Sequence, residues 1–136
     1  MKKWFPVLLV FAVMFVGCQQ SKTNSANNSE AKLTLLASST DLSQPGSITI
    51  KGQIKNTSTD RLDNVDVYLK SYDDNRQLLA TEKAPIEIRS LTPDQISSFQ
   101  VTMKDNRAAV RHLITFATES GKEIKFLQDG KINKGY

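Results

Sequence analysis

The fold is decided by the stretch SITIKGQIKN at residues 47–56, in which apolar and polar residues alternate. Ile48, Ile50 and Ile54 fall on one side of an extended chain, and threonine, lysine and glutamine fall on the other. A period of two predicts a β-strand with one buried face and one face in water. Strands that are polar on one side favour antiparallel pairing over parallel pairing.

The same period recurs from residue 31 to residue 127, with turn signals between the segments. Pro45-Gly46, Pro93-Asp94 and Ser120-Gly121 are the clearest of these signals, and Pro85 predicts an edge strand or a bend. No stretch of the domain carries the apolar stripe of a helix. The pattern therefore predicts an all-β fold, an immunoglobulin-like antiparallel β-sandwich of about seven strands. The residues expected to point inward are Leu33, Leu35, Ala37, Ile48, Ile50, Ile54, Val65, Val67, Leu69, Ile86, Ile88, Phe99, Val101, Met103, Val110, Ile114, Phe116, Ile124 and Phe126.

Residues 1–17 have the order of an export signal. Lys2 and Lys3 precede an uncharged apolar run from residue 4 to residue 16, and Gly17 is the small residue that follows it. This run is shorter than the roughly 20 residues that a transmembrane helix needs. The sequence therefore predicts a signal peptide over residues 1–17.

Phe15-Val16-Gly17-Cys18 resembles the lipobox of bacterial lipoproteins, with Phe15 in the place where leucine is usual. The resemblance implies cleavage between Gly17 and Cys18 and a thioether-linked diacylglycerol on Cys18. An ordinary signal peptide followed by a buried or disulfide-forming cysteine stays open as the alternative. Cys18 is the only cysteine, so the chain forms no internal disulfide.

The remaining chain divides into three parts. Residues 18–30 hold the cysteine and a Ser-, Asn- and Gln-rich segment that predicts a flexible tether, with a span of roughly 20 Å. Residues 31–128 form the expected sandwich, and residues 129–136 are expected to be a frayed tail. Removal of residues 1–17, which carry two lysines and no acid, lowers the net charge from +4 to +2. So small an excess does not predict a nucleic-acid binder.

Part of the sandwich resembles the bacterial FxLYD domain, over about residues 47–126. The segments that carry the resemblance are Gly52–Thr57, the Leu62, Val65 and Val67 pattern, Leu69–Asp73, Leu91–Asp94 and Phe99. Within the name motif Tyr72 and Asp73 match, whereas Leu69 and Ser71 depart from the family. The resemblance implies an immunoglobulin-like extracellular module, often on lipoproteins, without established enzymatic activity or catalytic residues.

No catalytic or metal-binding constellation emerges from the residues. His112 is the only histidine and shares a register with Val110 and Ile114, which predicts a core-side or rim position near a sheet end. Asp73-Asp74-Asn75 could suggest calcium, with Asp63 and Asp66 as further ligands, but the spacing lacks the glycine and distal glutamate of the known loop. A hairpin turn explains it, and we predict no metal, no cofactor and no enzymatic activity.

The sequence thus predicts a cell-membrane lipoprotein, anchored by lipid on Cys18 and facing the extracytoplasmic side. Its module is expected to bind an unknown protein or envelope component, with Tyr68, Lys122 and Lys125 as possible contact residues. The alternative is a binder of anionic envelope polymer or lipid headgroups through the lysines near the C-terminus. A hydrolase would instead require a deep pocket lined by carboxylates. The lysines of the alternative are Lys122, Lys125, Lys131 and Lys134.

Overall fold

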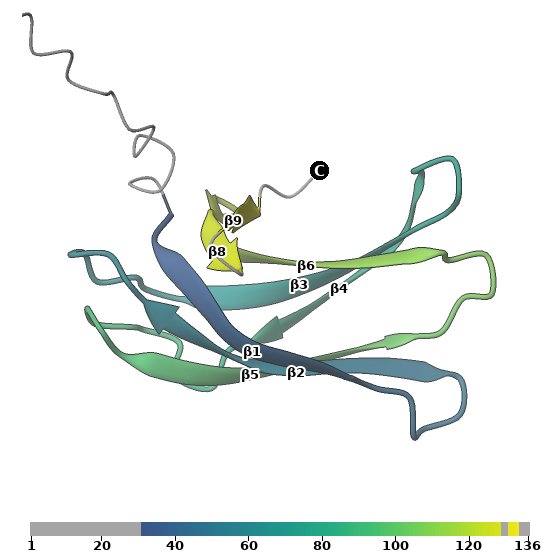
Figure 1. Cartoon of the computed structure of the whole chain (residues 1–136), viewed down its shortest axis with the longest axis horizontal. Coiled ribbons are helices and arrows are strands. Elements are labelled where there is room, and N and C mark those ends of the chain that lie inside the picture. Colours follow the sequence, from purple (N-terminus) through teal and green to yellow (C-terminus); the bar gives the residue numbers. More distant parts are fainter. Residues whose placement is uncertain (1–30, 129–130, 134–136) are drawn as a thin grey trace, which may run out of the picture.

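The computed structural model describes residues 31–128 and 131–133 (Figure 1). The predicted signal peptide, with Gly17, and the predicted tether, with Cys18, lie outside the described residues. So do residues 129–130 and 134–136 of the predicted tail. The described residues form nine strands and no helix. The strands are β1 (Leu33–Asp41), β2 (Ser47–Asn56), β3 (Val65–Tyr72), β4 (Leu78–Pro85), β5 (Ile96–Lys104), β6 (Arg111–Thr118), β7 (Glu123–Ile124), β8 (Phe126–Gln128) and β9 (Lys131–Asn133).

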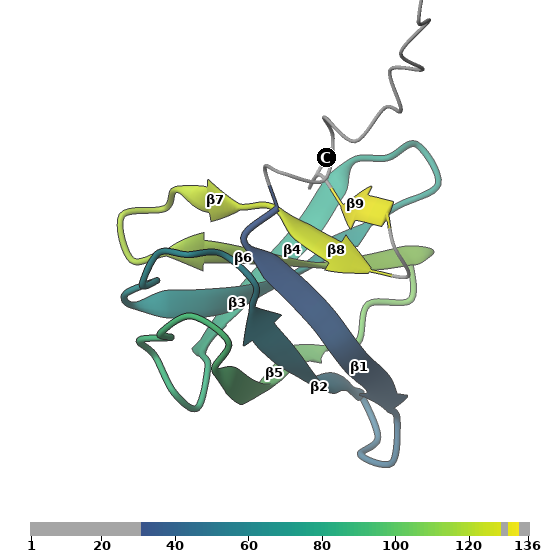
Figure 2. The ribbon, with the colours of Figure 1, turned by 60° about the vertical axis from the view of Figure 1, so that its left-hand side comes forward.

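Two sheets face each other and confirm the predicted sandwich. One sheet has the strand order β5-β2-β1-β8-β9, and the other has the order β4-β3-β6-β7. Every pair is antiparallel except β1 with β8. Figure 2 shows β8 beside β1 and β7 beside β6, so the C-terminal strands join opposite sheets. The fold is an all-β, immunoglobulin-like sandwich.

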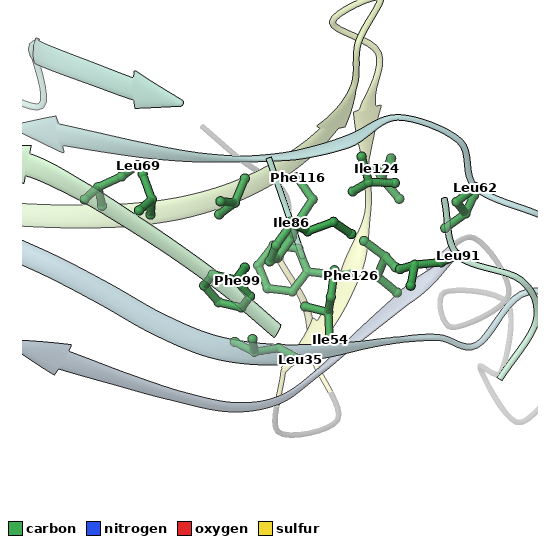
Figure 3. Close-up of a cluster of buried hydrophobic side chains, with 14 of the residues drawn as sticks. Leu35, Ile54, Leu62, Leu69, Ile86, Leu91, Phe99, Phe116, Ile124 and Phe126 are labelled. Atoms are coloured by element: carbon green, nitrogen blue, oxygen red, sulfur yellow. The ribbon is translucent and has the colours of Figure 1, made fainter. Parts of the chain in front are cut away.

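The core lies between the sheets and is built around three phenylalanines (Figure 3). Phe116 contacts Phe99 and Phe126 edge to face, with ring centroids 5.3 Å and 5.2 Å apart. Such contacts between perpendicular rings are favourable beyond the area they bury. The inward residues of β2, β3 and β5 are buried as the alternation predicted, apart from the partly buried Ile50.

Several expectations for the strands are wrong. Ala37 is exposed because a β-bulge at Leu36 shifts the register of β1. Ile86 is buried, but it precedes a run of bends and not a strand, and Ile88 is 38% exposed. Val110 lies in the loop before β6 and is 68% exposed.

The C-terminal part also differs from expectation. Residues 122–127 form two strands, because the chain leaves one sheet after Ile124 and joins the other at Phe126. The side chains of Ile124 and Phe126 are both buried, as predicted. Residues 131–133, expected in a frayed tail, form β9 and pair with β8.

The sandwich has two ends, which we call the near end and the far end. At the near end, where residue 31 joins the domain, the backbone of Thr57 bonds to Lys32 and that of Asn56 bonds to Gln95. At the far end the β1–β2, β3–β4 and β5–β6 loops gather, and the Asp105 N–H donates to the Gly46 carbonyl. Figure 1 shows these three loops opposite the point where the chain enters β1.

Candidate functional site

The outer face of the four-stranded sheet carries the most distinctive surface. Val65, Val67, Leu69 and Ser71 of β3 are buried on the inner side, so Tyr68 and Tyr72 point outward. The register places Arg111 opposite Tyr72 and Leu113 opposite Lys70. We call Tyr68, Lys70, Tyr72, Arg111 and Leu113 the Tyr–Arg face.

The far end of the Tyr–Arg face is hollowed. A recess of ≈ 170 Å³ is lined by Tyr72, Asp73, Arg76, Arg111 and Leu113. Arg76 comes from the β3–β4 turn, where its N–H donates to the Asp73 carbonyl and its φ of 64° is left-handed. Aromatic and arginine side chains beside an aliphatic one can contact a protein partner or an acidic group through rings and charged donors.

Tyr68, the predicted contact residue, is half-buried in the middle of this face. Its neighbours in register are Lys83 on β4 and Thr115 on β6. The two predicted lysines lie elsewhere. Lys122 is exposed in the turn before β7, and the Lys125 carbonyl accepts a hydrogen bond from Lys32 at the near end. The structure therefore does not join Tyr68 and the lysines into one surface.

The carboxylates considered for calcium are not brought together. Asp66 is buried at the start of β3, where Arg89 Nη2 lies 3.3 Å from Oδ1 and Lys83 Nζ lies 3.9 Å from Oδ2. Asp73 lies beyond the other end of β3, and its Oδ1 accepts the Gln77 N–H at 2.8 Å. Within the described ranges, no group of three or more His, Cys, Asp and Glu side chains could hold a metal ion.

Asp63 has local partners of its own. Hydrogen bonding from the Ser90 side chain, followed by that from Arg61, holds the pKa of Asp63 below its ordinary value. Arg61 Nε lies 2.7 Å from Asp63 Oδ1. This carboxylate is therefore engaged in the near-end loops and not in a site with Asp73.

His112 lies on the inner side of β6, at the core-side position near a sheet end that the sequence predicted. It pairs in register with Ser71 of β3. Among the described residues, His112 Nδ1 and Ser71 Oγ are buried and have no hydrogen-bond partner. Two unpartnered polar atoms in one cross-strand row are unusual, because a buried polar group without a partner is costly.

Two further recesses lie near other elements. One of ≈ 610 Å³ includes Gly52, Phe99 and Glu87 among its lining residues. Another of ≈ 450 Å³ lies at the near end, with Asp63 and Glu119 among its lining residues. Neither recess is lined by a histidine, so neither combines carboxylates with a side chain that could activate a nucleophile. Among the residues described, no helix has the length and apolar character to cross a membrane.

The sequence could not have revealed the recess of the Tyr–Arg face. Tyr72 is one of the residues that match the FxLYD motif, and Arg111 follows a turn. Only the register between β3 and β6 brings these two residues together. No signal within one segment encodes that register. Tyr68 could be predicted because it is a large aromatic on the polar side of an alternating strand.

Fold and surface together define a β-sandwich domain with a Tyr- and Arg-bearing sheet face. No family model matches the chain, and a comparison with curated proteins finds no match. Among solved structures, the archaellum periplasmic stator protein FlaG from Sulfolobus acidocaldarius is similar in structure, with a TM-score of 0.45 and 16% sequence identity. The alignment covers 68% of this chain and 93% of that chain. The resemblance to the FxLYD domain stays a prediction.

Proposed function

We propose that this chain is a lipid-anchored, extracytoplasmic binding module without enzymatic activity, and that the Tyr–Arg face contacts a protein partner. The observation that supports it is the combination of Tyr72, Arg111 and Leu113 around one recess. Tyrosine and arginine are enriched at the energetic centres of protein interfaces, because each combines a large contact area with polar groups.

The anchor in this proposal is a diacylglycerol on Cys18, as the lipobox resemblance implies. Two acyl chains hold a protein stably at a membrane, whereas one chain does so only marginally. The domain is joined to this segment at residue 31, at the near end. The far end, with its recess, is then the part of the domain most remote from the tether.

Site-specific photo-cross-linking in intact cells tests the binding role. A benzophenone amino acid replaces Tyr68 in the full chain, and a matched variant carries it at Gln100, which is exposed on β5 of the other sheet. We expect a discrete adduct from position 68 that is weaker after Arg111→Ala and absent from position 100. Equal adducts from both positions, or none from position 68, would contradict the proposed face.

Binding of anionic polymer or lipid headgroups through Lys122 and Lys125 is the alternative. It gains no support from the described near end, because Glu119 and Glu123 lie in the same segment between β6 and β8 as these lysines. A mixed surface of this kind gives little net attraction to anions. The alternative would predict strong salt dependence, and binding indifferent to ionic strength would reject it.

A further inference from the structure

The side of the sandwich between β1 and β6 is incomplete at the far end. β6 runs from Arg111 to Thr118, but within it β7 pairs only with Phe116 and Ala117. The first part of β6 therefore extends beyond β7. On the facing sheet, β8 pairs only with Leu33 and Thr34, although β1 continues to Asp41. Among the described residues, neither strand has a neighbour on this side along its far half.

The open part of β6 presents hydrogen-bonding groups in a known direction. The Thr118 N–H donates to the Lys122 carbonyl across to β7. Because the backbone N–H and C=O groups alternate in direction along a strand, those of Phe116, Ile114 and His112 point to the same side of β6 as those of Thr118. Those of Ile114 and His112 therefore point past the end of β7, where none of the described strands pairs with them. We call residues 111–115 the open β6 edge.

A second observation points to the same place. His112 Nδ1, on this edge, and Ser71 Oγ, beside it in the same row, are the two buried side-chain atoms without a partner among the described residues. Ser71 is 1% exposed. An additional strand on this edge would place a side chain next to His112 on the inner side of the sheet.

This edge also lacks the features that usually prevent strand addition. Edge strand β4 carries Glu82, Lys83 and Pro85, which discourage pairing with another chain. The edge of β5 is partly covered, because the Glu87 N–H donates to the Ser98 carbonyl. The open β6 edge reads RHLIT, with no proline and with a single charged residue, Arg111, at its start.

We propose that the open β6 edge accepts an extended segment of a partner protein as an added antiparallel strand, continuing the sheet where β7 ends. This inference rests on the proposed binding role and names the backbone mode of contact. Main-chain hydrogen bonds give such a complex its affinity, and alternate side chains give its specificity.

The surroundings define the chemistry of the segment. Its outward residues would lie beside Arg111 and Leu113 of β6, with Lys70 on the next strand, so acidic residues are favoured there. Its inward residues would lie beside Ile114 and His112. An aliphatic residue suits Ile114, and a small hydroxyl residue suits the position beside the partly buried His112.

Amide hydrogen exchange, followed by NMR on the full lipidated chain in detergent micelles, tests this proposal. The probe is the capped peptide Thr-Val-Glu-Thr-Glu-Val-Thr, which alternates inward aliphatic and hydroxyl residues with outward acids. In the free protein, the amides of His112 and Ile114 should exchange at least tenfold faster than those of Leu113 and Thr115, which point toward β3. The peptide should slow exchange at His112 and Ile114 at least tenfold.

Three matched controls make the test specific. A peptide that is N-methylated at its three inward residues should give no protection, because it cannot donate to the edge. A peptide with lysine in place of both glutamates should bind more weakly, and Lys70→Glu should reverse that preference. Ile114→Pro, which removes one edge donor, should abolish protection at His112.

Other outcomes would overturn the proposal. Slow exchange at His112 and Ile114 in the free protein would mean that the edge is already closed. Protection that depends on protein concentration without peptide would mean that a second copy pairs there. Equal protection by the N-methylated peptide, or protection on β5 at Gln100 and Thr102 instead, would exclude strand addition at β6. The cross-linking experiment at Tyr68 tests the Tyr–Arg face separately, so a failure of strand addition and a failure of the proposed binding role can be told apart.

Discussion

At the residue scale, Asn56 connects three parts of the near end. Its Nδ2 donates to the carbonyls of Asp60 at 2.7 Å and Leu91 at 2.9 Å, and its Oδ1 accepts the N–H and the hydroxyl of Ser58. The contact to the Ser58 N–H is a side-chain bond to the backbone two residues on, as is common for asparagine at the end of a strand. Asp73 instead accepts a hydrogen bond from the N–H of Gln77, four residues on.

Substitution of this asparagine should be costly. Asn56 is fully buried, so Asn56→Ala removes four hydrogen bonds and leaves buried groups unsatisfied. We expect a loss of about 3 kcal/mol in the free energy of unfolding, measured by urea denaturation. Ser58→Ala, which removes only the exposed end of the network, should cost about 1 kcal/mol. Equal losses for both variants would contradict this account.

Gly52 has a steric role that its neighbours explain. A Cβ atom at this position would lie 2.4 Å from the Ala37 carbonyl oxygen and 2.6 Å from the Phe99 ring. Gly52→Ala should therefore force the backbone of β1 away and destabilise the domain by about 1–3 kcal/mol. Gln53→Ala, at the exposed adjacent position, should change stability by less than about 0.5 kcal/mol in the same denaturation experiment.

Asp41 makes stability depend on acid pH. Hydrogen bonds from the Ser43 side chain and backbone, followed by that from Lys51, lower the pKa of Asp41 to about 2 from an ordinary 3.8. A carboxyl whose folded-state pKa is depressed stabilises the fold above its unfolded-state pKa and loses this contribution as the pH falls through the folded-state pKa. The stability difference between wild type and Asp41→Asn should therefore shrink from about pH 4 to about pH 2. A difference that is constant with pH would exclude this role.

At the element scale, the segment from Ile86 to Gln95 carries the chain from one sheet to the other. Val65 N–H donates to the Arg89 carbonyl, and the Arg89 side chain reaches back to Asp66. The Ile88 N–H donates to Ser97 Oγ on β5 at 2.8 Å. These contacts hold an irregular segment against both sheets.

Asp66 should control the order of this crossing segment. Asp66→Asn removes the charge that pairs with Arg89, whose side chain is about half exposed, so we expect a loss of about 1–2 kcal/mol. Amide exchange should accelerate at Glu87 and Ile88 and stay unchanged in the far-end loops. Lys83→Ala, which removes the longer 3.9 Å contact, should have an effect below about 0.5 kcal/mol. Uniform acceleration across the domain would contradict a local role.

These elements also show what the sequence could predict. Alternation at Ile48 and Phe99 predicted buried faces correctly, because a strand's period of two is a local property. Alternation predicted the buried Ile86 correctly but wrongly predicted a strand and a buried Ile88, because bonds to Val65 and Ser97 from other strands shape that segment. The bulge at Leu36 and the sheet change after Ile124 likewise depend on partners that no local pattern identifies. For the same reason Tyr68 could be predicted, whereas the recess could not.

At the scale of the whole molecule, the proposed attachment and the proposed contact surface lie at opposite ends of the domain. Residue 31 joins the domain at the near end, and the recess of Tyr72, Arg76 and Arg111 lies at the far end. β3 spans the distance between them in eight residues, or roughly 25 Å of extended chain. Under the proposed function, the sandwich would hold the recess at about this distance from the anchor.

The proposed function requires that the chain is attached to the membrane at Cys18, and this attachment is directly testable. Cys18→Ser removes the sulfur that would carry diacylglycerol, so the expected thioether cannot form. We expect the wild-type protein to sediment with membranes, to partition into detergent and to incorporate an alkyne-labelled fatty acid. The variant should lose the label. It should also no longer be cut before residue 18, because the cleavage that the lipobox resemblance implies needs the cysteine that ends the motif. Intact mass spectrometry distinguishes a lipidated chain that begins at Cys18 from an unmodified one. A chain of unmodified mass that begins at residue 18 would support the ordinary signal peptide, and the full precursor in the cytosol would exclude export.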